Sequence, residues 1–293
     1  MRVLFFLNFT KIHTVSMLEK IVILFSEAKI EMAAMKQQRE ELKVFEKYFM
    51  FIEDLEIKDC DLLLTVGGDG TMIKGAYYSA LYGKPIIGVS AGTLNYLTEI
   101  KEQTLEQDIR KILEGEYGVS RRCAISAIWD GGNIPFVLND ILITGMASYQ
   151  LNEFSVFCNG QAVDHYRADA YLFATPTGST AHLLAYGGPV VNLDMDAVVL
   201  RPVGAQTGLQ CPLVFPLKYD FAVECDKDTM IICDGKKGII LPAHNQLLVK
   251  RSKYETQFVT LGMENSVYRI REKLFYLNNG RKYINERIHF VPI

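Results

Sequence analysis

The stretch LLLTVGGDGTMIKGAYYSA, from Leu62 to Ala80, gives the clearest indication of the fold. It begins as an apolar run typical of a buried strand and ends with the spacing of a helix. Gly67, Gly68, Asp69 and Gly70 form a glycine-rich turn between the two. In an open parallel sheet such a turn lies at the carboxyl end of a strand, where ligands bind.

The segments around this stretch alternate in the same way. The runs VLFFL, DLLLTV and PIIGV read as strands, whereas SMLEKIVILFSEA, EELKVFEKYFMFIEDL and TLEQDIRKILEGE have helical spacing. Such alternation is typical of parallel strands joined by crossover helices. We therefore predict a Rossmann-like α/β domain over residues 1–104.

The residue pattern of the sequence changes after this domain. Short runs rich in Val, Ile, Phe and Tyr, among them FVLNDILIT, EFSVFC and AYLFAT, are separated by Gly, Pro, Asn and Asp. This pattern predicts a mainly antiparallel, β-sandwich-like domain over residues 105–263. Helical spacing returns in NSVYRIREKLFYL, and we expect residues 264–293 to pack back on the first domain.

Composition excludes several classes of function. The 293 residues include 31 Lys and Arg against 34 Asp and Glu, so the net charge of -3 offers no overall attraction for nucleic acid or anionic lipid. No apolar run approaches the roughly 18 residues that span a bilayer. The cysteines are scattered without a Cys-x-x-Cys pair, which indicates neither zinc nor disulfides. We expect a cytoplasmic protein without nucleic-acid or membrane partners.

The glycine turn has the properties of a phosphate site. Glycines let the backbone approach an anion, and the amides at a helix start direct donors toward it. An Asp beside phosphates is unfavourable unless it pairs with a cation or takes a proton from a hydroxyl that attacks phosphorus. This favours phosphoryl transfer to an alcohol. The alternative is an ordinary βα turn in which Asp69 caps the helix.

A second motif is TPTGSTA, from Thr175 to Ala181, followed by GGP from Gly187 to Pro189. Its dense hydroxyl groups suit an uncharged polar ligand such as ribose or a carboxamide. The alternative is a helix capped by Ser179 or Thr180.

Together, GGDGT, TPTGSTA and GGP resemble the NAD kinase family, and LND at Leu138 to Asp140 and SAGTLNYLTEI from Ser90 extend the resemblance. It implies a kinase that transfers a phosphoryl group from ATP, or polyphosphate, to the adenosine ribose 2′-hydroxyl of NAD, forming NADP. It also implies Mg²⁺ or another divalent metal, a two-domain fold with NAD between the domains, and a homo-oligomer, either a dimer or a tetramer.

The resemblance also assigns roles to residues. Asp69 would be the general base. Asn139 and Asp140 would contact the nucleotide, and Asp169 would be the acid before the Thr-Pro turn. The phosphate-binding turn would be Gly67, Gly68, Gly70 and Thr71, and the segment lining the dinucleotide would be Thr180, Ala181, His182, Leu183, Leu184 and Ala185. It assigns no protein residue to the metal.

Several positions depart from the family pattern. Asn95 stands where Gly is usual, Ala168 and Ala170 replace glycines, Asp140 replaces Glu, and His182 replaces Tyr. These departures leave the choice between NAD and NADH open. Two other functions remain: a lipid kinase of the diacylglycerol type, which shares GGDGT, and a catalytically silent NAD-binding protein. Asp234, in IICDGKKG, is predicted to lie in a hairpin turn. The alternative, which the resemblance implies, is a functional role, because the family has an Asp in this region that reaches toward the active-site cleft.

Overall fold

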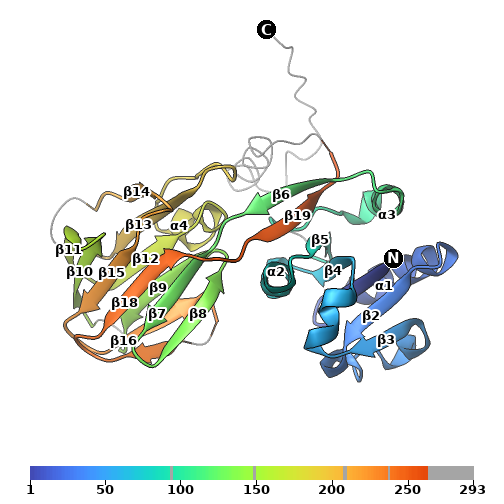
Figure 1. Ribbon diagram of the computed structural model, residues 1–293, viewed down its shortest axis with the longest axis horizontal. Coiled ribbons are helices and arrows are strands. Elements are labelled where there is room, and N and C mark those ends of the chain that lie inside the picture. Colours follow the sequence, from blue (N-terminus) through green and yellow to red (C-terminus); the bar gives the residue numbers. More distant parts are fainter. Residues whose placement is uncertain (93–94, 148–149, 207–209, 237, 263–293) are drawn as a thin grey trace, which may run out of the picture.

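The computed structural model describes residues 1–92, 95–147, 150–206, 210–236 and 238–262 (Figure 1). Within these ranges one sheet has seven strands in the order β3-β2-β1-β4-β5-β19-β6. Neighbouring strands pair in parallel, except that β6 is antiparallel to β19. The strands are β1 (Arg2–Leu7), β2 (Glu31–Met35), β3 (Phe49–Ile52), β4 (Leu62–Gly67), β5 (Pro85–Ser90), β6 (Gly118–Arg122) and β19 (Thr256–Thr260).

Helices cover both faces of this sheet. Helices α1 (Thr14–Glu27) and α3 (Leu105–Glu114) pack on one face, and α2 (Asp69–Tyr82) packs on the other. Strand β1 shows why both faces need a cover: Phe5 belongs to the core under α1 and α3, and its neighbours Leu4 and Phe6 belong to the core under α2. The predicted α/β unit is therefore confirmed.

The remaining described strands form two antiparallel sheets. Their orders are β11-β10-β15-β18-β7-β8 and β14-β13-β12-β9-β16-β17. The strands are β7 (Ile125–Trp129), β8 (Gly132–Val137), β9 (Asp140–Gly145), β10 (Asn152–Cys158), β11 (Gln161–Ala168), β12 (Ala170–Ala174), β13 (Ala197–Val203), β14 (Leu213–Pro216), β15 (Phe221–Cys225), β16 (Thr229–Cys233), β17 (Ile239–Leu241) and β18 (Gln246–Arg251).

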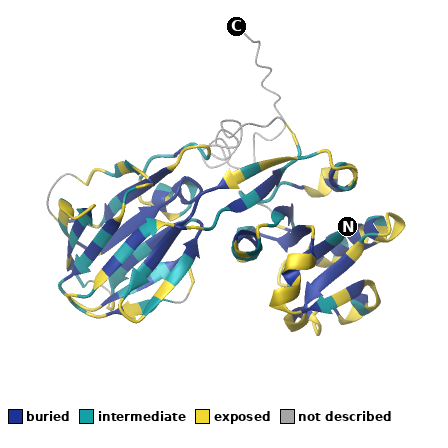
Figure 2. Cartoon of the chain, viewed as in Figure 1, coloured by how far each residue is buried: buried dark blue, intermediate teal, exposed yellow. Residues whose placement is uncertain are grey.

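The two sheets share one core, which Figure 2 shows as buried strands with exposed outer residues. Aromatic side chains join them: the ring centroids of Phe154 in β10 and Tyr171 in β12 are 5.9 Å apart, and Phe173 of β12 packs on Phe221 of β15. The β-sandwich-like prediction is confirmed. No described helix is long and apolar enough to cross a membrane.

One predicted helix is wrong. EELKVFEKYFMFIEDL contains a short 3-10 helix (Lys43–Tyr48) and strand β3, and a second 3-10 helix (Asp54–Asp59) begins at its end. The segment Phe49–Ile52 forms a strand because it pairs in parallel with β2, a strand that we did not predict. Phe49 also packs edge-on against Phe5 in β1, with ring centroids 5.2 Å apart. Pairing with the sheet outweighs the helical spacing.

The observed units differ from the expected boundaries. Strands β6 and β19 belong to the first sheet and helix α3 packs on it, although all three lie within the range 105–263. The chain passes between the units twice, from β6 to β7 and from β18 to β19, and the two passages run side by side (Figure 1). Residues 264–293, expected to pack on the first domain, lie outside the described residues.

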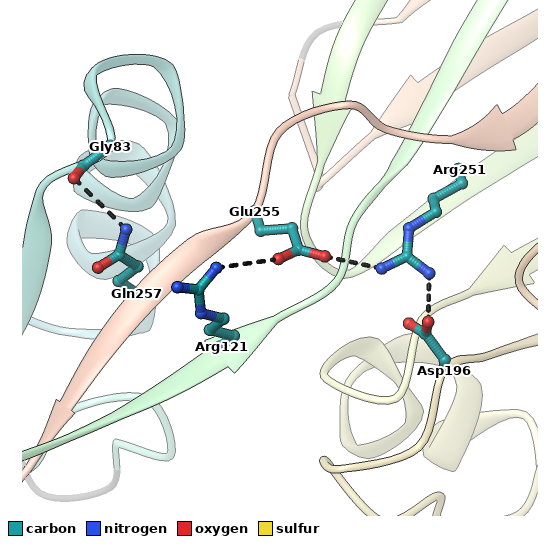
Figure 3. A network of polar contacts seen from close by, with 6 residues as sticks. All are labelled: Gly83, Arg121, Asp196, Arg251, Glu255 and Gln257. Atoms are coloured by element: carbon teal, nitrogen blue, oxygen red, sulfur yellow. Dashed lines mark hydrogen bonds and ion pairs between the residues drawn. The ribbon is translucent and has the colours of Figure 1, made fainter.

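A polar network spans this junction (Figure 3). Glu255, just before β19, lies 3.9 Å from Arg121 Nη1 and 2.7 Å from Arg251 Nη2. Arg251 also pairs with Asp196 of the β-sandwich. On the other side, Thr256 Oγ1 donates to the carbonyl of Ala76 in α2. The junction therefore contacts both units through side chains as well as through the chain itself.

Candidate active site

The glycine turn lies where the sequence predicts it, between β4 and α2. Gly67 ends the strand, Gly68 precedes the helix and Asp69 is its first residue. A Cβ at Gly67 would lie 2.4 Å from Thr71 Oγ1, and one at Gly68 would lie 3.0 Å from Asn95 Oδ1. A Cβ at Gly70 would meet no described atom within 4 Å. Packing therefore favours glycine at position 67, leaves little room for a Cβ at position 68 and does not require Gly70.

The Asp69 carboxylate bonds to a segment outside its own helix. Its Oδ1 accepts hydrogen bonds from the backbone N–H groups of Tyr96, at 2.8 Å, and Leu97, at 2.9 Å. The preceding residue, Gly68, makes no side-chain cap. Asn95 ties the same segment to the turn, because its Nδ2 donates to Ser90 Oγ at 2.7 Å and to the Gly67 carbonyl at 3.3 Å. The carboxylate is thus held by the chain that follows β5.

The loop Leu138–Asp140, between β8 and β9, lies against α2. Leu138 shares a buried cluster with Met72 and Ala76 of that helix. The Oδ1 atom of Asn139 is buried and has no hydrogen-bond partner among the described residues. An unsatisfied buried acceptor costs about 1–3 kcal/mol, so a donor on a ligand would be favoured there. This is the residue that the resemblance assigns to the nucleotide.

The Thr-Pro turn contacts this loop directly. Thr175 Oγ1 donates to the Leu138 carbonyl at 2.5 Å, and the Thr175 N–H donates to the Asn139 carbonyl at 2.9 Å. A Cβ at Gly178 would lie 2.0 Å from that same Asn139 oxygen, so only glycine fits. The structure therefore joins two motifs that lie far apart in the sequence.

The expected helix cap in this turn is absent from the described hydrogen bonds. Ser179 Oγ donates to the Pro176 carbonyl at 2.7 Å and accepts the Val191 N–H at 3.0 Å, while Thr180 Oγ1 donates to the Thr177 carbonyl. Neither hydroxyl accepts from the helix start. Capping by Ser179 or Thr180 is therefore wrong, because these hydroxyls close the turn itself.

His182 and Asp140, two departures from the family pattern, contact each other. His182 Nδ1 lies 3.1 Å from Asp140 Oδ1. The Asp140 side chain is 2% exposed, whereas that of His182 is 51% exposed. Burial raises the pKa of Asp140, and the hydrogen bond and charge of His182 partly oppose this rise. The pair links helix α4 (His182–Ala185) to the loop.

The described contacts do not bring two of the predicted site residues, Asp169 and Leu183, to the loop Leu138–Asp140. Asp169 is exposed just before the amino-terminal end of β12, whereas the Thr-Pro turn follows its carboxyl end, about 20 Å away at 3.3 Å per residue. Leu183 is fully buried and packs with Leu172 and Val199. Its neighbours Ala181, Leu184 and Ala185 are more exposed.

For Asp234, sequence reasoning favours a hairpin turn over a functional role. Asp234 and Gly235 have φ angles of 50° and 68° between β16 and β17, which confirms the hairpin turn. Its carboxylate also reaches the loop Leu138–Asp140. The two segments are 95 residues apart, and no local pattern signals the contact.

Two family models match the chain, one over each of its two parts. The family model of the ATP-NAD kinase N-terminal domain matches residues 2–117, and that of the ATP-NAD kinase C-terminal domain matches residues 138–261. The chain is similar to a solved yeast NADH kinase complexed with NADH, with a TM-score of 0.82, 19% identity and coverage of 98% of this chain and 90% of that one. It is also similar to a solved NAD kinase from Archaeoglobus fulgidus in complex with ATP, with a TM-score of 0.75, 21% identity and coverage of 94% and 99%.

The relatives found by sequence are also named NAD kinases. An NAD kinase of Caldanaerobacter subterraneus is 32% identical over 222 residues, which are 73% of this chain and 78% of the relative. An NAD kinase of Legionella pneumophila is 32% identical over 200 residues, which are 66% and 68%. No support appears for the lipid-kinase or silent-protein alternatives. With both domains matched and this identity over most of its length, the chain belongs to the NAD kinase family.

Proposed function

We propose that this protein transfers a phosphoryl group from ATP to the adenosine ribose 2′-hydroxyl of NAD, forming NADP. Family membership supports the reaction class. The observation that carries the proposal is the setting of Asp69, whose carboxylate is held by two backbone donors at the carboxyl edge of the sheet. A solved relative contains ATP and another contains NADH.

In this reaction Asp69 accepts the proton of the 2′-hydroxyl as that oxygen attacks the γ-phosphorus. The new P–O bond forms while the bond to ADP breaks, and ADP leaves. General-base assistance of this kind is worth about 10² to 10⁴ in rate. Gly67, Gly68, Gly70 and the first amides of α2 offer the phosphates close approach and donors.

Residues of the loop Leu138–Asp140 and of the Thr-Pro turn make the proposed contacts with the nucleotide. Asn139 Oδ1, buried without a described partner, accepts a hydrogen bond from the dinucleotide. Asp140 and His182 form the polar edge beside it, with Thr180, Ala181, Leu184 and Ala185 continuing the surface. The contact between this loop and α2 brings the nucleotide side and the Asp69 side of the site to the same helix.

We also propose that the reaction uses Mg²⁺ or another divalent ion, with polyphosphate as an alternative donor. Mg²⁺ is commonly held by substrate phosphates and water with few protein ligands, so the ion would reach the glycine turn bound to the donor phosphates, and Asp69 keeps its role as the base. When bound, the ion neutralises charge on the transferred group. We further propose that the protein is cytoplasmic and forms a homo-oligomer. The composition supports the first part, and the family resemblance supports the second.

The decisive experiment replaces Asp69 with Asn. The amide Oδ1 of Asp69→Asn still accepts from Tyr96 and Leu97, so the fold and the binding of NAD should be kept. We expect kcat to fall at least about a hundredfold in an assay of NADP formation from NAD and ATP with Mg²⁺. Asp108→Asn is the matched control, because Asp108 lies in the first turn of α3. Near-normal kcat in Asp69→Asn would refute the base assignment.

A further inference from the structure

The turn that contains Asp234 does more than reverse the chain. The carboxylate accepts the N–H of Leu138 at 2.9 Å through Oδ2, and the N–H groups of Asn139 at 2.7 Å and Asp140 at 3.4 Å through Oδ1. In return, the Asp234 N–H donates to the Asp140 carbonyl at 3.0 Å. Successive N–H groups that converge on one anion form a backbone nest, here filled by the protein's own carboxylate.

The opposite side of the loop is also held. The carbonyls of Leu138 and Asn139 both accept hydrogen bonds from Thr175, and Gly178 lies so close to the Asn139 carbonyl that a Cβ would not fit between them. The backbone of Leu138 and Asn139 is therefore bonded on both sides. The polar atom left without a described partner is the Asn139 side-chain Oδ1. Such a loop presents the amide in one orientation instead of letting it rotate into a bond with its own backbone.

The same turn also contacts the kinase domain. Lys236 Nζ lies 5.7 Å from the centre of the Tyr77 ring in α2, within the range of a cation–π contact. Tyr77 packs edge-on against Phe136, just before the loop, with ring centroids 6.2 Å apart. Helix α2 begins with Asp69. The turn thus lies against both the nucleotide loop and the helix of the proposed base.

From these contacts we propose that Asp234 is a positioning residue: it holds Leu138–Asp140 so that Asn139 and Asp140 meet the dinucleotide in register with Asp69. The inference rests on the proposed function. Asp234 does not touch the substrate, because both carboxylate oxygens face the loop amides. Its loss should therefore weaken the use of NAD more than the use of ATP.

Two variants test this assignment. Asp234→Ala leaves the loop amides without an acceptor, whereas Asp234→Asn keeps Oδ1 for Asn139 and Asp140 and turns an NH₂ group toward the Leu138 N–H. Asp228→Asn is the matched control, because Asp228 lies in the connection between β15 and β16 and accepts a single described backbone bond, from Ala243, away from the loop.

Three measurements follow: kcat and KM for NAD and for ATP, the Kd for NAD by calorimetry, and amide hydrogen exchange of residues 138–140 without ligand. For Asp234→Ala we expect faster exchange of the loop and a rise of about tenfold or more in KM and Kd for NAD, with KM for ATP within about twofold. Asp234→Asn should lie between this variant and the wild type. A variant that is merely less folded would lower kcat and leave both KM values unchanged.

The outcomes separate the two proposals. If the wild type forms NADP and both Asp234 variants keep the KM for NAD of Asp228→Asn, the positioning role is wrong and the function stands. Unchanged exchange in Asp234→Ala would also overturn it. If the wild type forms no NADP, the function is wrong, and the Kd for NAD in the variants still decides the role of Asp234. Absence of NAD binding in the wild type would overturn both.

Discussion

Replacing Gly70 with Ala separates the demands of folding from those of phosphate binding. Gly70 is the second residue of α2, a Cβ there meets no described atom within 4 Å, and its φ angle lies outside the left-handed region. Ala is the better helix former by up to about 1 kcal/mol. For a chain of this size that gain corresponds to an increase in Tm of roughly 2–4 °C.

The same methyl group would occupy the open space above the turn, where we propose that the donor phosphates lie. Gly70→Ala should therefore be as stable as the wild type or more stable, while kcat/KM for ATP falls about tenfold or more, the equivalent of 1.4 kcal/mol. Thermal unfolding and the NADP-formation assay measure the two effects on the same preparation.

Gly75→Ala provides the opposite control in the same helix. A Cβ at Gly75 would lie 2.7 Å from Ile86 Cδ1 and 2.8 Å from Thr65 Cγ2, inside the core below α2. Overpacking of this kind costs about 1–3 kcal/mol. We expect Gly75→Ala to lower Tm and to leave KM for ATP unchanged. A folded Gly70→Ala protein with wild-type kcat/KM for ATP would refute the idea that this glycine admits phosphate.

Three further changes probe the site. Gly178→Ala places a methyl group 2.0 Å from the Asn139 carbonyl oxygen, so we expect the free energy of unfolding to fall by about 2 kcal/mol or more. Urea unfolding measures this loss, and an unchanged midpoint would show that the close contact is absent. Burial raises the pKa of Asp140 above 3.8, so the folded state binds its proton more tightly and loses stability as the pH rises from 3.8 through the raised pKa. Asp140→Asn should show a flatter stability curve over that window, and an equally steep curve would rule this out. Asn95→Ala removes the bonds to Ser90 and Gly67, so hydrogen exchange at residues 96–97 should increase; unchanged exchange would show that Asn95 does not hold this segment.

Local patterns were enough to predict much of the fold. Apolar runs such as DLLLTV can be satisfied only by burial on both faces, which indicates a central strand of a covered sheet. A glycine-rich run directly after such a strand indicates a turn of the chain into the next element, and Asp-Gly between β-rich runs indicates a hairpin. These inferences succeeded because each depends on neighbours in sequence. The helix expected in EELKVFEKYFMFIEDL failed because its aromatic residues pair with β2, which lies elsewhere in the chain.

The site divides in the same way. The sequence by itself determined where the glycine turn lies and which carboxylate it holds, because steric and hydrogen-bonding requirements of a strand-to-helix turn act over a few residues. Only the tertiary structure decided that Asp69 bonds to Tyr96 and Leu97, that Asp234 holds the loop Leu138–Asp140, and that Asp169 lies at the far end of its strand. Those contacts join segments up to 96 residues apart, and their energies come from burial and geometry that no local pattern encodes.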